Sequence, residues 1–112
     1  MYIPKSLVNG VNLTNSAATY YTAPASTKAI VKKATFCNDH TSPVTVTVNL
    51  VPSAGSAAYG NAITKTKALA AGETWSCPDV ENHVMETGGF ISMVASVDAK
   101  VGVRISGFEV VA

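Results

Sequence analysis

The sequence has few charged residues and no long apolar run. Charged residues make up 13% of the 112 residues and the formal net charge is +1, whereas a typical globular domain has roughly twice that charged share. Because affinity for phosphate or anionic lipid needs a positive excess, this balance favours neither nucleic acid nor a membrane surface as a partner. No stretch of about 18 consecutive apolar residues is present, so the sequence predicts no transmembrane helix.

Cysteine is also scarce, with only Cys37 and Cys77. The first residues, 1–13, do not have the continuous apolar segment of a signal peptide, because Pro4 and Asn9 interrupt them. We therefore expect the chain to fold in the cytosol, where thiols stay reduced. The simplest role for both cysteines is that of small buried apolar side chains.

Helix signals are rare, whereas β-branched Val and Thr are abundant and favour a pleated surface. Turn residues recur at short intervals, as in an all-β sandwich or barrel. The clearest strand is "PVTVTVNLV", in which apolar and polar residues alternate. One side of this strand has Val44, Val46, Val48 and Leu50, and the other has Thr45, Thr47 and Asn49.

Further strands are expected at 17–22, 28–37, 62–69, 90–97 and 101–111. Two lysines interrupt the phase of 28–37, which predicts a bulge there. The lysines of 62–69 suit an edge strand, whereas 90–97 is apolar on both sides and suits a central one.

Three further local features are predicted from the sequence. Residues 98–100 are expected to connect 90–97 and 101–111 as a hairpin. Gly107 marks a bulge or bend within the last strand. The stretch 77–89 is the one place where a helical turn is expected.

These segments predict a single all-β domain, an antiparallel β-sandwich of about seven or eight strands over residues 17–112. Residues 1–16 are either an N-terminal arm or a first strand that closes the sandwich. Stacking two sheets would bury one side of each strand. The expected core residues are Val44, Val46, Val48, Leu50, Val101, Val103 and Ile105. The threonine side of 44–50 is then either solvated or in contact with a partner.

Candidate chemistry is sparse. Cys37-x-x-His40 has a spacing that zinc accepts, and Cys77 with His83 would add two ligands. Either cysteine could instead pair with His40 or His83 as a nucleophile and its base. A buried thiol beside an exposed loop histidine is the simpler interpretation, so we expect no metal, no cofactor and no enzyme activity.

Other polar and aromatic groupings are weaker. Asp79, Glu81 and Glu86 flank His83, which is typical of a solvated polar loop. Lys28, Lys32, Lys33 and Arg104 could form a basic patch with Tyr20, Tyr21 and Phe36 as stacking platforms for a single strand. Trp75, Tyr59, Tyr20 and Tyr21 could instead stack on a sugar ring.

Three segments, "APASTKAIVKKATFCNDHTSPVTVTVNLVPSAGSA", "KALAAGETWSCPDV" and "GGFISMVASVDAKVGVRISGFEV", occur in this order. In this respect the sequence resembles small structural proteins of tailed bacteriophages, in particular the capsid cement (decoration, or stapling) proteins of short-tailed phages. The resemblance covers residues 23–111 and contains no catalytic signature. Similar modules occur among tail, neck, baseplate and fibre proteins of these viruses.

The resemblance implies a jelly-roll β-sandwich that binds the outer surface of a phage capsid and cements neighbouring subunits. The implied partner is the major capsid protein, and a homodimer at a local two-fold axis is the favoured assembly. The implied location is the virion. The alternatives are a tail, neck or fibre component, or a carbohydrate-binding module.

Candidate partner-binding residues lie in two segments. The N-terminal segment has apolar residues without a period and could become ordered on a partner. An aromatic residue among small ones in the loop 53–61 is a second possible anchor. The candidates are Tyr2, Ile3, Pro4, Leu7, Val8 and Tyr59.

Overall fold

The computed structural model describes residues 2–56, 59–78 and 80–111, and the side chains of Tyr2 and Tyr59 fall outside that description. The described residues form nine strands and one short 3-10 helix. The elements are β1 (Tyr2–Asn12), β2 (Ala18–Thr22), β3 (Thr27–Asn38), β4 (Val44–Val51), η1 (Tyr59–Asn61), β5 (Ala62–Leu69), β6 (Thr74–Ser76), β7 (Val84–Met85), β8 (Phe90–Ala95) and β9 (Val101–Val111).

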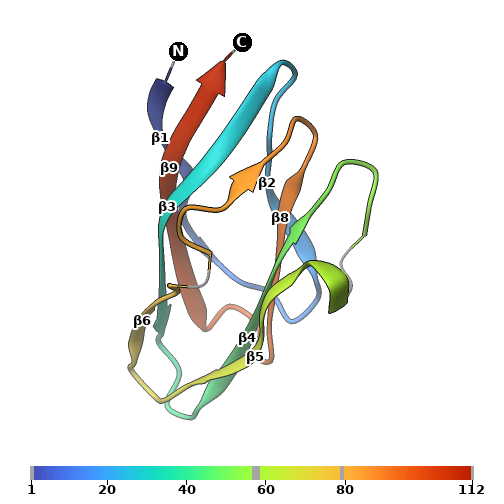
Figure 1. Ribbon diagram of the computed structural model, residues 1–112. Coiled ribbons are helices and arrows are strands. Elements are labelled where there is room, and N and C mark those ends of the chain that lie inside the picture. Colours follow the sequence, from blue (N-terminus) through green and yellow to red (C-terminus); the bar gives the residue numbers. More distant parts are fainter. Residues whose placement is uncertain (1, 57–58, 79, 112) are drawn as a thin grey trace.

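The strands form two antiparallel sheets that stack face to face (Figure 1). One sheet has the order β1–β9–β3–β6, with β7 also paired to β3, and the other has the order β2–β8–β4–β5. The chain crosses repeatedly from one sheet to the other, so that most paired strands are distant in sequence, and β4 and β5 are the consecutive strands that pair. This order is that of a jelly roll, which confirms the predicted fold class, with nine described strands instead of seven or eight.

The sandwich core contains the valines that the alternation predicted. Val44, Val46 and Val48 are at most 1% exposed, and Val101, Val103 and Ile105 are also buried. Removing such a side chain from water stabilises the fold by about 1.5–3 kcal/mol. The prediction for Leu50 was wrong in degree: it packs against the core but is only half-buried. Leu50 lines a groove at one end of the sandwich, where water reaches it.

The predicted bulge in β3 is confirmed, because the pairing of β3 with β9 shifts between Val31 and Lys33. The pairing of β1 with β9 shifts at the same level, between Ser6 and Val8. The extra residues therefore lie in β3, next to the residue opposite Gly107, and in β1, opposite Ser106 and Ile105, and not at Gly107 itself. A Cβ atom at Gly107 would lie 2.0 Å from the carbonyl oxygen of Ile30, so only glycine allows β3 and β9 to approach this closely.

Two local predictions were wrong. The stretch 77–89 contains turns and the short strand β7, with no helical turn among its described residues. Residues 98–100 do not connect a hairpin, because β8 and β9 lie in different sheets. In contrast, β8 is central and β5 is an edge strand, as predicted. Local sequence predicts a turn but not which sheet the chain enters after it.

Of the two alternatives for residues 1–16, the described residues Tyr2–Asn12 form a strand, β1, which pairs with β9 from Tyr2 opposite Val110 to Asn12 opposite Gly102. The start of β1 and the end of β9 therefore lie together at one end of the molecule (Figure 1).

The opposite end is held by Asn38, which is fully buried at the end of β3. Its Nδ2 donates hydrogen bonds to the carbonyl oxygens of Ser42, Leu69 and Ala70 at 3.1–3.2 Å. Its Oδ1 accepts one from the backbone N–H of His40 at 2.9 Å. One amide thus ties the loop after β3 to the turn after β5.

Candidate assembly surfaces

The candidate partner-binding residues of β1 have different environments. Leu7 and Val8 are 7% and 3% exposed and belong to the core, so their side chains are not available to a partner. Ile3 is 38% exposed and Pro4 is exposed. The remaining two candidates, the side chains of Tyr2 and Tyr59, lie outside the described residues.

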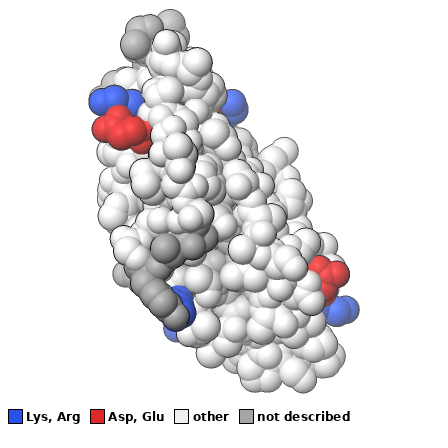
Figure 2. Space-filling model, turned by 90° about the vertical axis from the view of Figure 1, so that its right-hand side faces the viewer, with Lys and Arg blue, Asp and Glu red and all other residues white. Residues whose placement is uncertain are grey.

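The outer side of the β2–β8–β4–β5 sheet has almost no charge. Strands β2, β4 and β8 contain no Lys, Arg, Asp, Glu or His. Their outward residues include Thr45 and the pair Thr47 and Val94, all half-buried. Figure 2 views the molecule from the side where this sheet lies in Figure 1 and shows a broad area without charged side chains. We call this surface the neutral face. It is the threonine side that the sequence left open between solvent and a partner.

The loop after β4 covers part of the neutral face. Asn49 Nδ2 donates a hydrogen bond of 2.8 Å to Asn61 Oδ1, and Asn61 Nδ2 donates one to the carbonyl of Ser56 at 3.0 Å. Gly55 lies against Val51, because a Cβ atom there would be 3.2 Å from Val51 Cγ1. Asn49 is therefore only 7% exposed although its strand position faces outward.

The outer side of the other sheet has a row of apolar side chains across four strands. Pro4 on β1 is paired with Phe108 on β9, Phe108 with Ile30 on β3, and Ile30 with Val84 on β7. Pro4 is exposed, Phe108 and Ile30 are half-buried, and Val84 is 54% exposed. Sequence reasoning missed this row because only the strand register brings these residues together.

Basic residues flank the row. On β3, Lys28 lies on one side of the row and Lys33 on the other. Lys32 occupies the bulge that precedes Lys33, and Arg104 lies further along β9. Lys28 forms an ion pair of 3.2 Å with Glu86, and Lys32 Nζ donates a hydrogen bond of 2.8 Å to Asn82 Oδ1. We call this surface, the apolar row with its flanking bases, the cationic face.

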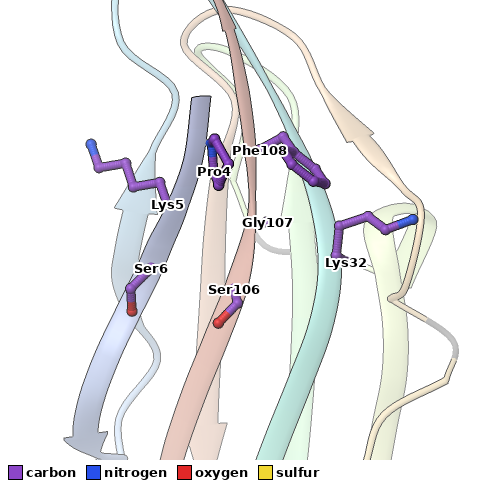
Figure 3. Close-up of a pocket in the computed structure, with 7 residues that line it drawn as sticks. All are labelled: Pro4, Lys5, Ser6, Lys32, Ser106, Gly107 and Phe108. Atoms are coloured by element: carbon purple, nitrogen blue, oxygen red, sulfur yellow. The ribbon is translucent and has the colours of Figure 1, made fainter. Parts of the chain in front are cut away.

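A shallow groove of about 450 Å³ runs along the cationic face. Figure 3 shows Pro4 and Phe108 on neighbouring strands, with Lys5 and Lys32 pointing away on opposite sides. The groove is lined by Pro4, Lys5, Ser6, Lys32, Ser106, Gly107 and Phe108. It is open enough to receive a side chain of another protein rather than to enclose a small molecule.

The structure separates the residues suggested for zinc or cysteine chemistry. Cys37 is exposed, whereas Cys77 is buried. His83 is exposed on the loop before β7, and His40 lies in the loop after β3. Among the described residues, no group of three or more His, Cys, Asp or Glu side chains gathers as a metal site.

The aromatic residues do not form a common platform. Phe36 is fully buried, and its ring centroid lies 5.6 Å from that of Trp75. Lys67 Nζ lies 5.4 Å from the centroid of the Trp75 ring, a cation–π contact between the edge strands β5 and β6. Tyr20 and Tyr21 belong to β2, an edge strand of the other sheet. The basic residues of the cationic face therefore have neither tyrosine beside them.

Sequence reasoning also missed Glu109, which is 7% exposed and faces the interior. Tyr21 Oη donates a hydrogen bond of 2.5 Å to its Oε2, and Lys5 Nζ lies 3.2 Å from the same oxygen. The Tyr21 hydrogen bond lowers the pKa of Glu109; burial opposes this shift and Lys5 adds to it. Burial, followed by the hydrogen bond and charge of Glu109, raises the pKa of Tyr21. The sequence does contain a sign of this site, because Glu109 is the one acidic residue among the inward-facing positions of β9.

The class that this geometry defines is a jelly-roll β-sandwich with two broad outer faces. No known family model matches the sequence, and a search of curated proteins finds no relative. The described residues contain no helix of the length and apolarity that crossing a membrane requires.

Solved structures share the fold at low sequence identity. A chain from the structure of Bacillus endospore appendages, which form a family of disulfide-linked pili, matches with a TM-score of 0.53 and 16% identity over 99% of this chain and 88% of that chain. A chain of the infectious bursal disease virus T13 particle matches with a TM-score of 0.56 and 13% identity over 97% of this chain. A chain of the Gx strain of that virus gives 0.54 and 15% over 97% of this chain.

The protein spans only 30% and 31% of the two viral chains. At these identities the likeness establishes the fold alone. The chain therefore shares its jelly roll with chains of virus particles and of a pilus.

Proposed function

We propose that this chain is a non-enzymatic structural protein of a virion, a cement protein that binds the major capsid protein on the outer surface of a tailed-phage shell. The observation that carries the proposal is the neutral face: three strands without a charged residue on the outside of a folded domain. Depletion of charge is the compositional mark of the centre of a protein–protein interface. The sequence resemblance to phage cement proteins and the fold shared with virus-particle chains support the same role.

The neutral face suits contact with a second copy of the chain. In a two-fold dimer each surface patch meets its own equivalent, so charges of one sign within the patch would repel. The neutral face has none on β2, β4 and β8. A dimer spanning two capsid subunits would bind with both copies at once, so each contact could be weak while the dimer stays bound.

Imaging tests the role directly. Purified protein added to tailed particles that lack it should give density on the capsid surface at regular lattice positions in cryo-electron microscopy. Density confined to the tail or neck would favour the tail, neck or fibre alternative. No bound protein at saturating concentration would overturn the proposal.

A charge placed on the neutral face tests the dimer. Thr45→Glu should raise the dimer dissociation constant at least tenfold in sedimentation equilibrium, because two buried carboxylates would face each other. Thr35→Glu is the matched control, since Thr35 is also a half-buried threonine on a central strand, β3, of the opposite sheet. Equal dissociation constants for both variants and the parent would exclude the neutral face as the dimer surface.

The carbohydrate-binding alternative has less support in the geometry. Trp75, its main candidate, is half-buried, packs against Phe36 and has Lys67 over its ring. A sugar stacking on that side of Trp75 would have to displace the lysine.

A further inference from the structure

Resting on the proposed function, we infer that the cationic face is the surface that contacts the shell, and that the shell presents carboxylates around an apolar patch there. The cationic face combines two features that suit contact with another protein: exposed apolar surface and charge of one sign. Its apolar row includes Val84, which is 54% exposed. Its flanking charges are all of one sign on the three long strands.

The sign of the charge follows from the strand sequences. Strands β1 and β3 contain no Asp or Glu, and Glu109, the acidic residue of β9, is buried beneath the sheet. Lys33 and Arg104 point to the outside of the same strands and are exposed. Glu86, on the loop after β7, pairs with Lys28 at the margin of this surface.

The positive charge of the cationic face indicates which kind of partner can bind there. A second copy packed on the cationic face would place Lys32, Lys33 and Arg104 against the same cations, and like charges repel strongly in a desolvated contact. A partner with carboxylates around an apolar centre would pair with these bases and cover Val84 and Ile30. The face therefore fits a different protein, whereas the neutral face fits a second copy.

The area is sufficient for a specific contact. Strands of eleven and twelve residues extend roughly 35 Å, and four strand positions span roughly 19 Å, giving at most about 700 Å², since the short strands β6 and β7 fill the fourth position only in part. A standard protein–protein interface buries about 800 Å² per partner. The apolar row crosses all four strand positions, so apolar side chains would extend from one edge of this interface to the other.

Zero-length cross-linking of assembled particles identifies the partner groups. Carbodiimide couples a lysine amine to a carboxylate in direct contact, so treated particles should yield peptides joining Lys32 or Lys33 to an Asp or Glu of the major capsid protein. Cross-links from these lysines only to this chain, while Lys100 couples to the capsid protein, would overturn the inference.

Matched variants test the same surface by affinity. Lys33→Glu should weaken binding to shells at least tenfold and reduce its salt dependence, whereas Lys100→Glu, an equal charge change in the exposed 98–100 turn, should not. Val84→Ser should also weaken binding, and Val11→Ser, which changes a valine 39% exposed on β1, is its control. Circular dichroism checks that all four variants fold.

The outcomes separate the two proposals. If the parent protein does not bind shells, the proposed function fails, and this inference with it. If the parent binds and Lys33→Glu and Val84→Ser bind equally well, only the cationic face is excluded. If a double-stranded DNA oligonucleotide binds the parent more tightly than shells do and Lys33→Glu abolishes this, the partner is nucleic acid and the inference is wrong.

Discussion

The hydroxyl of Tyr21 on β2 donates a 2.5 Å hydrogen bond to the carboxylate of Glu109 on β9, and so joins the two sheets of the sandwich. Lys5 on β1 contacts the same carboxylate oxygen at 3.2 Å. Three strands therefore meet at one nearly buried charge. A buried carboxylate is stable only when such donors replace the water it has lost.

Tyr21→Phe should lower the free energy of unfolding by about 1–3 kcal/mol, because it removes the hydrogen bond to a charged group that water cannot fully replace. Tyr20→Phe is the matched control on the same strand. The Tyr20 hydroxyl accepts a 3.3 Å hydrogen bond from the exposed backbone N–H of Thr14, so its loss should cost less. Urea unfolding at pH 7 measures both values, and equal costs would contradict the role given to Glu109.

Glu109 should make the protein sensitive to acid. Its pKa in the folded chain lies below the ordinary 4.5 because Tyr21 and Lys5 favour the charged form, although burial opposes them. The unfolded chain thus takes up the proton first as the pH falls, so stability decreases from about pH 5 down through the lowered pKa. Glu109→Gln should flatten this part of the profile in urea unfolding at pH 3, 4, 5 and 6. An unchanged slope would show that other carboxylates cause it.

Tyr21 should give a loss of stability in alkali. Burial and Glu109 raise its pKa above the ordinary 10.0, so above pH 10 the unfolded chain loses this proton while the folded chain keeps it. The free energy of unfolding should therefore fall as the pH rises past 10. Tyr21→Phe should remove that part of the decline, measured by thermal unfolding between pH 9 and 11 relative to the value at pH 8. If the decline persists in the variant, Tyr21 is not its source.

Gly107→Ala should destabilise the protein by about 3 kcal/mol or more, since the added Cβ would lie 2.0 Å from the Ile30 carbonyl oxygen and force β3 away from β9. Gly102→Ala is the control on the same strand, because the nearest atom to its added Cβ, Asn12 Oδ1, is 3.7 Å away. The midpoint of urea unfolding compares them. Similar midpoints would show that the sheet adjusts at Gly107 without cost.

Asn38→Ala should cost about 2–4 kcal/mol, because the carbonyl oxygens of Leu69 and Ala70 would lose their donor in a closed site. Asn15→Ala, at an exposed position between β1 and β2, should change stability by less than about 0.5 kcal/mol. Hydrogen exchange gives a second readout, with faster exchange at the N–H of His40 in the first variant only.

Much of this fold could be predicted from the sequence because side chains in β-strands alternate between two sides. The alternation in 44–50 identified the core valines, the paired lysines marked the bulge in β3, and Lys65 with Lys67 marked the edge strand β5. These features depend on local backbone geometry and on which side of one strand is apolar, and both can be read along the chain.

What only the tertiary structure decided was the pairing of distant strands. The turn at 98–100 looked the same whether the chain stayed in one sheet or changed to the other, so the hairpin prediction failed. The row from Pro4 to Val84 and the contact of Tyr21 with Glu109 both depend on register between strands far apart in sequence. Local alternation determines what each strand buries; the competition among all strands for neighbours determines which side chains share a surface.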